Sequence, residues 1–236
     1  MTFHVLQSLQ QVSDSRKLLR KHHLSFLTPK WKSFLRRHRL FPGFNIGDEV
    51  KGWDVLKTIE FIQENIEKDV PVLDIGAFGS EVPLILYKLG FKNIHGIDLN
   101  PNILKLQSKN NINYTIGDFM KTSFNDSSFG AITSISVIEH GFNAKALLHE
   151  MSRLLKSGGF FIASMDYWPN KIDTSKTNLF NMSWTIFSKE EIIDFIKLAK
   201  NYGLNLYGET HFDASTKPIS FMNQNYTFGW LVLQKI

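Results

Sequence analysis

Three aspartates are spaced along the chain as a nucleoside-binding site would require. Asp74, Asp98 and Asp118 lie 24 and 20 residues apart, in the apolar, strand-like runs VLDIG, HGIDLN and TIGDF. A carboxylate at a strand end, as at Asp98, can accept hydrogen bonds from both hydroxyls of a ribose. Asp118 can accept a hydrogen bond from the exocyclic amine of an adenine in the same way. The spacing predicts a crevice for an adenosine-containing ligand.

Two glycines separate the first of these strands from the helix expected after it. Gly76 lets the backbone come close to a ligand, and Gly79 can adopt a positive φ. Asp74 can support this loop and the ammonium end of a ligand. The dinucleotide fingerprint G-x-G-x-x-G is absent, because the run from Gly76 reads GAFGS. A ligand without a pyrophosphate relaxes that glycine requirement, so the pattern favours S-adenosylmethionine (SAM) over a dinucleotide.

Helical and strand patterns alternate along most of the chain, which predicts an α/β fold. The expected helices are 53–66, 80–90, 100–110, 144–159 and 188–203. The expected strands are 71–76, 93–98, 112–118, 130–140, 160–168, 204–210 and 226–236. The last two strands have little helix between them and suggest a hairpin at one sheet edge. We therefore expect a mostly parallel sheet with helices on both faces.

The composition suits a folded domain in a reducing compartment. The chain has 236 residues, 43% of them hydrophobic, and no cysteine. No apolar run approaches the roughly 20 residues that cross a bilayer. Without thiols there is neither a disulfide framework nor a thiolate metal site. These features favour a cytoplasmic protein.

Positive charge is concentrated near the N-terminus. Residues 1–47 hold nine Lys or Arg and one acid, a net charge of +8, whereas the other 189 residues carry −3. We expect a basic N-terminal helical arm or cap over residues 1–47 and the main domain over residues 48–236. Helices that cap the domain with a solvated basic face are the favoured interpretation. An amphipathic arm that contacts nucleic acid or an anionic membrane remains open.

Five motifs in order resemble those of the class I SAM-dependent methyltransferases, from about Val70 to the C-terminus. They are VLDIGAFGS, GIDLNP, GDF, FGAITSISVIEHG and LLKSGGFFIAS. The resemblance implies a seven-stranded, mostly parallel sheet with the last strand antiparallel, and SAM as the cofactor. The first motif departs from the family pattern D-x-G-x-G-x-G, because Phe78 and Ser80 replace its second and third glycines. The bulky Phe78 must point away from the cofactor or pack on it.

The resemblance also implies which residues surround the cofactor. They are Asp74, Gly76, Ala77, Phe78, Gly79, Asp98, Leu99, Asp118, Phe119 and Ser136. Lys51 precedes the first strand by one helix and is a further candidate at the methionine end. No group of acids and histidines has convincing metal-ligand spacing, so we expect metal-independent chemistry.

The acceptor is expected to be a small or carbohydrate-like molecule that is methylated on oxygen or nitrogen. His140, after the fourth strand, is the candidate catalytic base, with shaping of the pocket as the alternative. The segment 166–187 is long for a simple connection and rich in aromatic residues, Phe180 among them. It suits either an acceptor site with Asp166 as a hydrogen-bond acceptor or a hydrophobic lid.

Two other functions remain open from the sequence. One is a non-catalytic binding module that has lost SAM through the change at Phe78. The other is an RNA methyltransferase that uses the basic arm.

Overall fold

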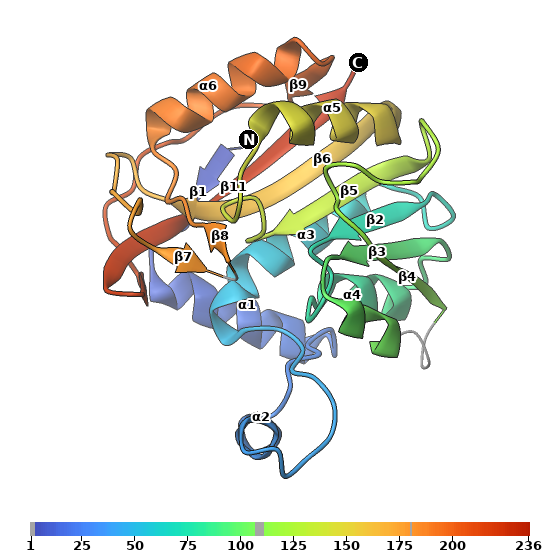
Figure 1. Ribbon diagram of the computed structural model, residues 1–236, viewed down its shortest axis with the longest axis vertical. Helices are drawn as coiled ribbons and strands as arrows, with labels where there is room; N and C mark the ends of the chain where they lie inside the picture. The colour runs from blue at the N-terminus through green and yellow to red at the C-terminus, as the bar shows by residue number, and fades with distance from the viewer. Residues whose placement is uncertain (1–2, 107–110, 180) are drawn as a thin grey trace.

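One mixed sheet runs through the molecule, with helices packed on both faces (Figure 1). The structure is a computed structural model and describes residues 3–106, 111–179 and 181–236. In the described residues the sheet has the order β1-β11-β6-β5-β2-β3-β4, and β9 and β10 also pair with β11. The N-terminal strand and the C-terminal strand are neighbours in it.

The elements have the following bounds. The strands are β1 (Phe3–Val5), β2 (Val72–Ile75), β3 (Ile94–Asp98), β4 (Ile112–Ile116), β5 (Phe129–Ile135), β6 (Leu155–Tyr167), β9 (Leu204–Leu206), β10 (Ile219–Phe221) and β11 (Gln224–Lys235), with a separate pair β7 (Asn178–Leu179) and β8 (Met182–Ser183). The helices are α1 (Leu9–Lys21), α2 (Lys30–Arg37), α3 (Gly52–Asn65), α4 (Val82–Lys88), α5 (Ala144–Leu154) and α6 (Lys189–Lys200), and the 3₁₀ turns are η1 (Glu49–Lys51) and η2 (Pro101–Leu106).

The strand directions confirm the predicted fold class. Strands β4, β3, β2, β5 and β6 run parallel, and β11 is antiparallel to β6 from Thr227 opposite Tyr167 to Gln234 opposite Phe160. The chain leaves β2 toward β3 on one side and returns to β5 on the other, so the strand order reverses between β2 and β5. In open parallel sheets this switch point, at the carboxyl ends of the strands, is where ligands bind.

The sheet divides the apolar core into two layers. Helices α1, α3 and α4 bury Leu19, Ile59 and Ile85 against one face. Helices α5 and α6 bury Leu148 and Ile192 against the other. Because helices cover both faces of the sheet, all four residues of β2 are buried, Asp74 among them.

The structure differs from the predicted elements in four places. Strands β1 and β10 join the sheet, which has nine strands in the described residues where seven were expected. Helix α5 ends at Leu154, so the sequence KSGG opens β6 and does not close the helix. The fourth strand, β5, ends at Ile135, five residues earlier than expected. The helix expected at 100–110 is a 3₁₀ turn, η2, and residues 107–110 lie outside the described residues.

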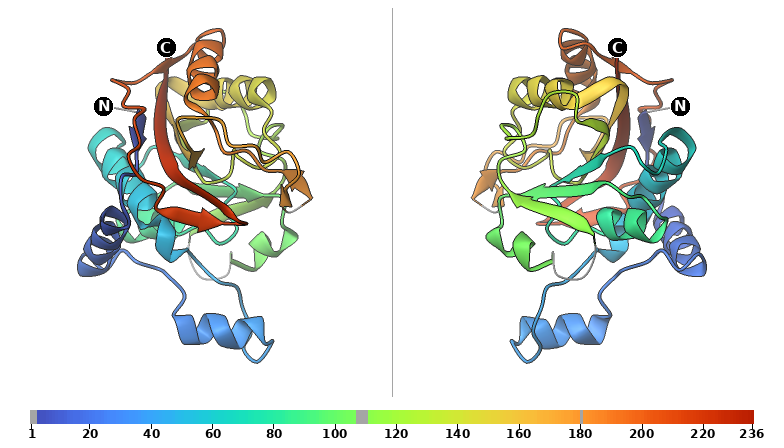
Figure 2. Two further views of the ribbon diagram at one scale, coloured as in Figure 1. Left: turned by 90° about the vertical axis from the view of Figure 1, so that its left-hand side faces the viewer. Right: turned by 90° about the vertical axis from the view of Figure 1, so that its right-hand side faces the viewer.

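The N-terminal segment is partly woven into the domain and partly projects from it. Strand β1 pairs with β11, and α1 packs along α3. Helix α2 stands away from the body on two loops (Figures 1 and 2), with Trp31 58% and Phe34 60% exposed. Among the described residues, no helix combines the length and apolar character needed to cross a membrane.

A buried ion pair fixes α1 to the start of α4. Arg16 and Glu81 are fully buried and lie 2.7 Å apart between Nη1 and Oε2. Arg16 also donates to the Asp48 carbonyl, and the other carboxylate oxygen of Glu81 accepts from the Phe26 N–H at 2.8 Å. These bonds compensate the removal of both charges from water.

Removing the charge of Glu81 tests this anchor. In Glu81→Gln the Arg16 guanidinium stays buried without its counter-charge, so we expect the free energy of unfolding to fall by about 3 kcal/mol. Urea denaturation measures the change. The exposed pair Lys197–Asp194 supplies the control, because Asp194→Asn should cost less than about 0.5 kcal/mol. A loss below about 1 kcal/mol in Glu81→Gln would show that the pair does not anchor α1.

Candidate active site

The turn after β2 is held in one shape by its neighbours. Gly76 and Gly79 have φ values of +68° and +85°. A side chain at Gly76 would also overlap Val137, which follows β5. The Ala77 N–H donates to the Ile97 carbonyl at 3.1 Å. The turn therefore needs glycine at position 76 for both conformation and space.

The Asp98 carboxylate joins this turn to the end of β3. Its Oδ2 accepts from the Phe78 N–H at 3.0 Å, and its Oδ1 accepts from the Asn100 N–H at 2.8 Å. A carboxylate has about four acceptor positions, so two remain for a ligand. Leu99 (56% exposed) lies next to Asp98, and Ile116 (44% exposed) pairs with Asp98 at the end of β4. This edge offers an acceptor for hydroxyls beside uncovered apolar surface.

The third acidic strand end is more open. Asp118 is exposed, and its Oδ1 accepts from the Met120 N–H at 2.8 Å. Phe119 is half-buried and packs against the core layer under α5 and α6. Part of the Phe119 ring is therefore covered by the core.

Asp74 lies beneath the turn. It is buried and accepts from the Thr133 hydroxyl at 2.5 Å. Burial raises the pKa of Asp74 to about 7, because the charged form loses its hydration. The predicted support of the loop is compatible with this position. Contact with a ligand's ammonium end, the other predicted role, stays a prediction; the carboxyl is not among the groups that line the cavity.

The Phe78 ring packs against an aromatic ring of the N-terminal segment. It meets the Phe44 ring edge to face, with 5.1 Å between the ring centroids. The Gly47 N–H donates to the Gly79 carbonyl at 2.7 Å, so the loop before η1 lies along the turn. The bulky residue at this position is thus accommodated by an aromatic contact with the N-terminal segment.

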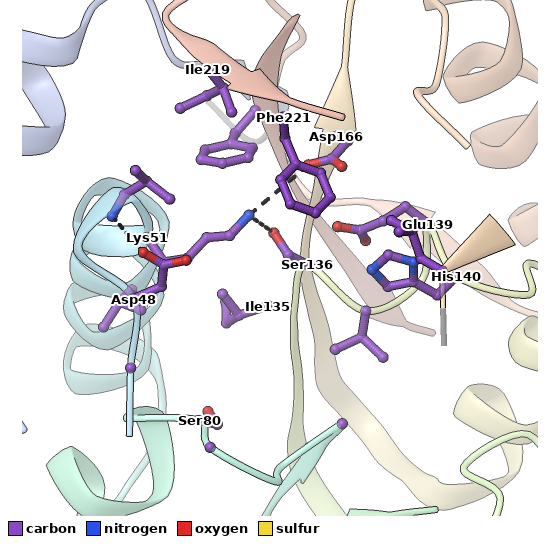
Figure 3. A pocket seen from close by; sticks show the side chains of 18 of the residues that line it. Asp48, Lys51, Ser80, Ile135, Ser136, Glu139, His140, Asp166, Ile219 and Phe221 are labelled. Atoms are coloured by element: carbon purple, nitrogen blue, oxygen red, sulfur yellow. Dashed lines mark hydrogen bonds and ion pairs between the residues drawn. The ribbon is translucent and has the colours of Figure 1, made fainter. Parts of the chain in front are cut away.

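A cavity of about 600 Å³ opens beside the turn (Figure 3). Five parts of the chain line it: the glycine turn, the residues after β5, η1 with the start of α3, the segment 166–187, and the β10–β11 hairpin. The lining includes Lys51, Gly76, Phe78, Ser136, Glu139, His140, Asp166, Trp184, Phe221, Tyr226 and Phe228.

Lys51 lies at the centre of this cavity. Its Nζ donates to the Ser136 hydroxyl, is 4.0 Å from Asp166 Oδ1 and lies 3.6 Å from the centroid of the Phe228 ring. Asp166 also accepts from the Trp184 indole N–H at 2.8 Å. The ammonium is therefore held by a hydroxyl, a carboxylate and an aromatic face.

Asp54 and Glu139 are buried near the same cation. Asp54 accepts from the Ser164 hydroxyl at 2.8 Å, and burial raises the pKa of Asp54 to about 6. Glu139 is 1% exposed, and burial, followed by the nearby Asp166, raises its pKa well above the ordinary range. Its Oε2 has no hydrogen-bond partner among the residues that the structure describes.

His140 is neutral in this environment. It is half-buried, and burial, followed by the nearby Lys51 charge, lowers the pKa of His140 to about 4. A neutral imidazole can accept a proton or a hydrogen bond, but the lowered pKa makes it a weak base at neutral pH.

The structure brings part of the predicted site together at the cavity. Gly76, Phe78, Gly79, Ser136 and His140 line it, while Asp74 and Ala77 are buried under the turn. The predicted adenosine residues lie outside the cavity lining, on the neighbouring strand ends: Asp98, Leu99, Asp118 and Phe119. Phe180, in the aromatic segment, lies outside the described residues. Tyr226, on the last predicted strand, also lines the cavity, whereas Phe221 comes from β10, a strand that was not predicted.

Asp54 and Glu139 are not among the residues predicted from the sequence. A signal for Asp54 is present, because it is the one acid between apolar Trp53 and Val55 at the start of α3. Glu139 directly precedes His140, the predicted catalytic base. Neither residue revealed its burial from local sequence.

Comparison with known proteins gives a partial match in sequence. Residues 73–163 match the family model described as "Methyltransferase domain". The chain is similar to EEF1A lysine methyltransferase 2 of Mus musculus, with 31% identity over 128 residues, which are 48% of this chain and 52% of that protein. The chain therefore spans about half the length of the curated relatives it matches first.

Solved structures share the fold at low sequence identity. Phosphoethanolamine N-methyltransferase 2 of Haemonchus contortus, in complex with SAM, superposes with a TM-score of 0.58 at 16% identity, covering 88% of this chain and 60% of that one. The [4+2]-cyclase SpnF superposes with a TM-score of 0.60 at 13% identity, covering 80% and 84%. The motif series, the family match and the shared fold confirm the predicted resemblance to the class I SAM-dependent methyltransferases and support S-adenosylmethionine as the cofactor.

Proposed function

We propose that this protein transfers a methyl group from SAM to a nitrogen or oxygen atom of an acceptor held in the cavity beside Lys51. The observation that carries the proposal is the position of that cavity. It adjoins the glycine turn at the β2/β5 switch point, with the Asp98 carboxylate on the neighbouring strand end. A cofactor that lies along the strand ends would reach the cavity with its reactive end.

The residues around the turn fit an adenosyl cofactor. Asp98 retains acceptor capacity for the two ribose hydroxyls, and exposed Leu99 and Ile116 can cover an adenine ring. Lys51 can pair with the carboxylate at the methionine end. When bound, SAM supplies a methyl group activated by the sulfonium. The protein then has to orient the acceptor and exclude water.

The cavity also fits the expected acceptor site. Trp184 and Asp166, both from the segment predicted to form that site, line its wall. His140 reaches the same space and, being neutral, can hold an acceptor by a hydrogen bond. We propose metal-independent transfer to a small acceptor, by a protein that acts in the cytoplasm.

The fold alone does not establish methyl transfer, because a [4+2]-cyclase shares it. The cavity beside the glycine turn favours the enzyme. The basic helix α2 favours neither RNA nor membrane over the other, so contact with either is no part of the proposed activity.

Loss of the Asp98 carboxylate tests the cofactor site. Asp98→Ala removes the proposed ribose hydrogen bonds, so its affinity for S-adenosylhomocysteine should fall by about 1.5–3 kcal/mol, the value for bonds to a charged group. Isothermal titration calorimetry measures this. The exposed Asp194→Ala variant should bind like the wild type. Equal affinity in Asp98→Ala and wild type would exclude Asp98 from the site, and a wild type that does not bind would favour the binding module.

The pH dependence of stability tests the burial of Asp74. A carboxyl whose pKa is raised to about 7 in the folded state contributes stability below pH 4 that is lost as the pH rises through 7. The Asp74→Asn side chain does not ionise, so this loss of stability is absent. Its amide oxygen can still accept a hydrogen bond from the Thr133 hydroxyl. The variant should match the wild type near pH 4 and be more stable by on the order of 3 kcal/mol at pH 8. Urea denaturation across this range measures the difference. If the difference in the free energy of unfolding between Asp74→Asn and wild type does not change with pH, the raised pKa of Asp74 is contradicted.

A further inference from the structure

The acids around the cavity outnumber the cations that face them. Asp54, Glu139 and Asp166 are each at least 95% buried, and of the described residues that line the cavity, Lys51 is the single Lys or Arg. His140 is neutral beside them. Because a buried carboxylate without a partner is costly, the cluster must hold protons or receive a further cation.

Glu139 and Asp166 each have one carboxylate oxygen without a hydrogen-bond partner among the described residues, but that of Asp166 lies 4.0 Å from the Lys51 ammonium. Asp54 is bound to Ser164, and Asp166 is bound to Trp184 and lies near Lys51. Glu139 lines the cavity, and its Oε2 has no hydrogen-bond partner among the described residues. In Figure 3 its carboxyl group points into the space between Ser136, His140 and Asp166. A buried acceptor directed into a cavity calls for a donor that the protein does not supply.

Aromatic rings complete the surroundings. Trp184 packs edge to face on Phe221 and lies 5.8 Å from Tyr226 between ring centroids. These three rings line the cavity with Phe228, over which the Lys51 ammonium already lies. Ring faces beside carboxylates attract ammonium groups more than neutral hydroxyls. The cavity therefore discriminates in favour of a cation.

We propose that the acceptor is an aliphatic amine that enters as an ammonium ion and is held by Glu139 within the aromatic wall of Trp184, Phe221 and Tyr226. The inference rests on the proposed methyl transfer and names its substrate class. A free amine and the side chain of a peptide-borne lysine present the same chemistry. A sugar hydroxyl carries no charge and would leave Glu139 holding its proton.

Groups at the site account for the proton and the electron pairs that move in the methyl transfer. The ammonium gives one proton to the Glu139 carboxylate, whose burial raises its pKa and makes it a stronger base than His140. The freed nitrogen pair forms the N–C bond while the C–S bond breaks and its electron pair stays on sulfur. The product is the N-methylated ammonium ion with S-adenosylhomocysteine, and the proton passes from Glu139 to solvent.

The test compares a cation with a neutral molecule of the same shape. Wild-type protein saturated with S-adenosylhomocysteine is titrated with n-butylammonium and with butan-1-ol, and binding is followed by NMR. We expect butylammonium to bind at least tenfold more tightly. Equal binding of the two probes would overturn the proposal without any variant.

The isosteric Glu139→Gln variant tests the assigned residue. Its affinity for butylammonium should fall at least tenfold, while its affinities for butan-1-ol and S-adenosylhomocysteine change less than twofold. The exposed Asp194→Asn variant is the matched control. If Glu139→Gln instead weakens S-adenosylhomocysteine and leaves butylammonium unchanged, the acids serve the cofactor's own ammonium and the proposal is wrong.

The source of the amine is resolved by a third probe. Nα-acetyl-lysine methylamide should bind at least as tightly as butylammonium if the acceptor is a protein side chain, and more weakly if it is a free amine. Both results require that the amine binds more tightly than the alcohol. Both therefore support an aliphatic amine as the substrate class. Failure of S-adenosylhomocysteine to bind would reject the proposed function itself, which separates the two failures.

Discussion

The site depends on one constrained turn, the five residues from Gly76 to Ser80. Val137 occupies the space where a side chain at Gly76 would lie, and Asp98 holds the Phe78 N–H. The Gly47 N–H fixes the turn from the N-terminal side. The turn therefore joins β2, β3, β5 and the N-terminal segment at a single point, and the cavity opens beside it.

Around that turn the protein keeps groups that stability alone would not favour. Buried carboxyl groups with raised pKa values oppose folding at neutral pH, as at Asp54, Asp74 and Glu139. The surrounding scaffold offsets this through two apolar layers and the Arg16–Glu81 anchor. Buried titratable groups with shifted pKa values are concentrated at functional sites. For this reason we interpret the cavity as the site of the reaction.

Local sequence predicted the parts of the fold that local interactions decide. The glycine turn, the acid at the end of β3 and helix α6, expected over residues 188–203, follow from neighbouring residues. Strand β1 could not be predicted, because its three residues become a strand by pairing with Gly229 to Leu231 at the other end of the chain. The environment of Glu139 is non-local for the same reason, since it combines α3, β6 and the β10–β11 hairpin.

A crystal structure with S-adenosylhomocysteine bound is the most direct test of the central claim. We predict the ribose hydroxyls on the Asp98 carboxylate, the backbone of the Gly76 turn beneath the ligand, and the sulfur facing the cavity between Ser136 and Glu139. Crystals grown in excess ligand that show it bound elsewhere, or the Phe78 ring turned into the crevice in its place, would contradict the account.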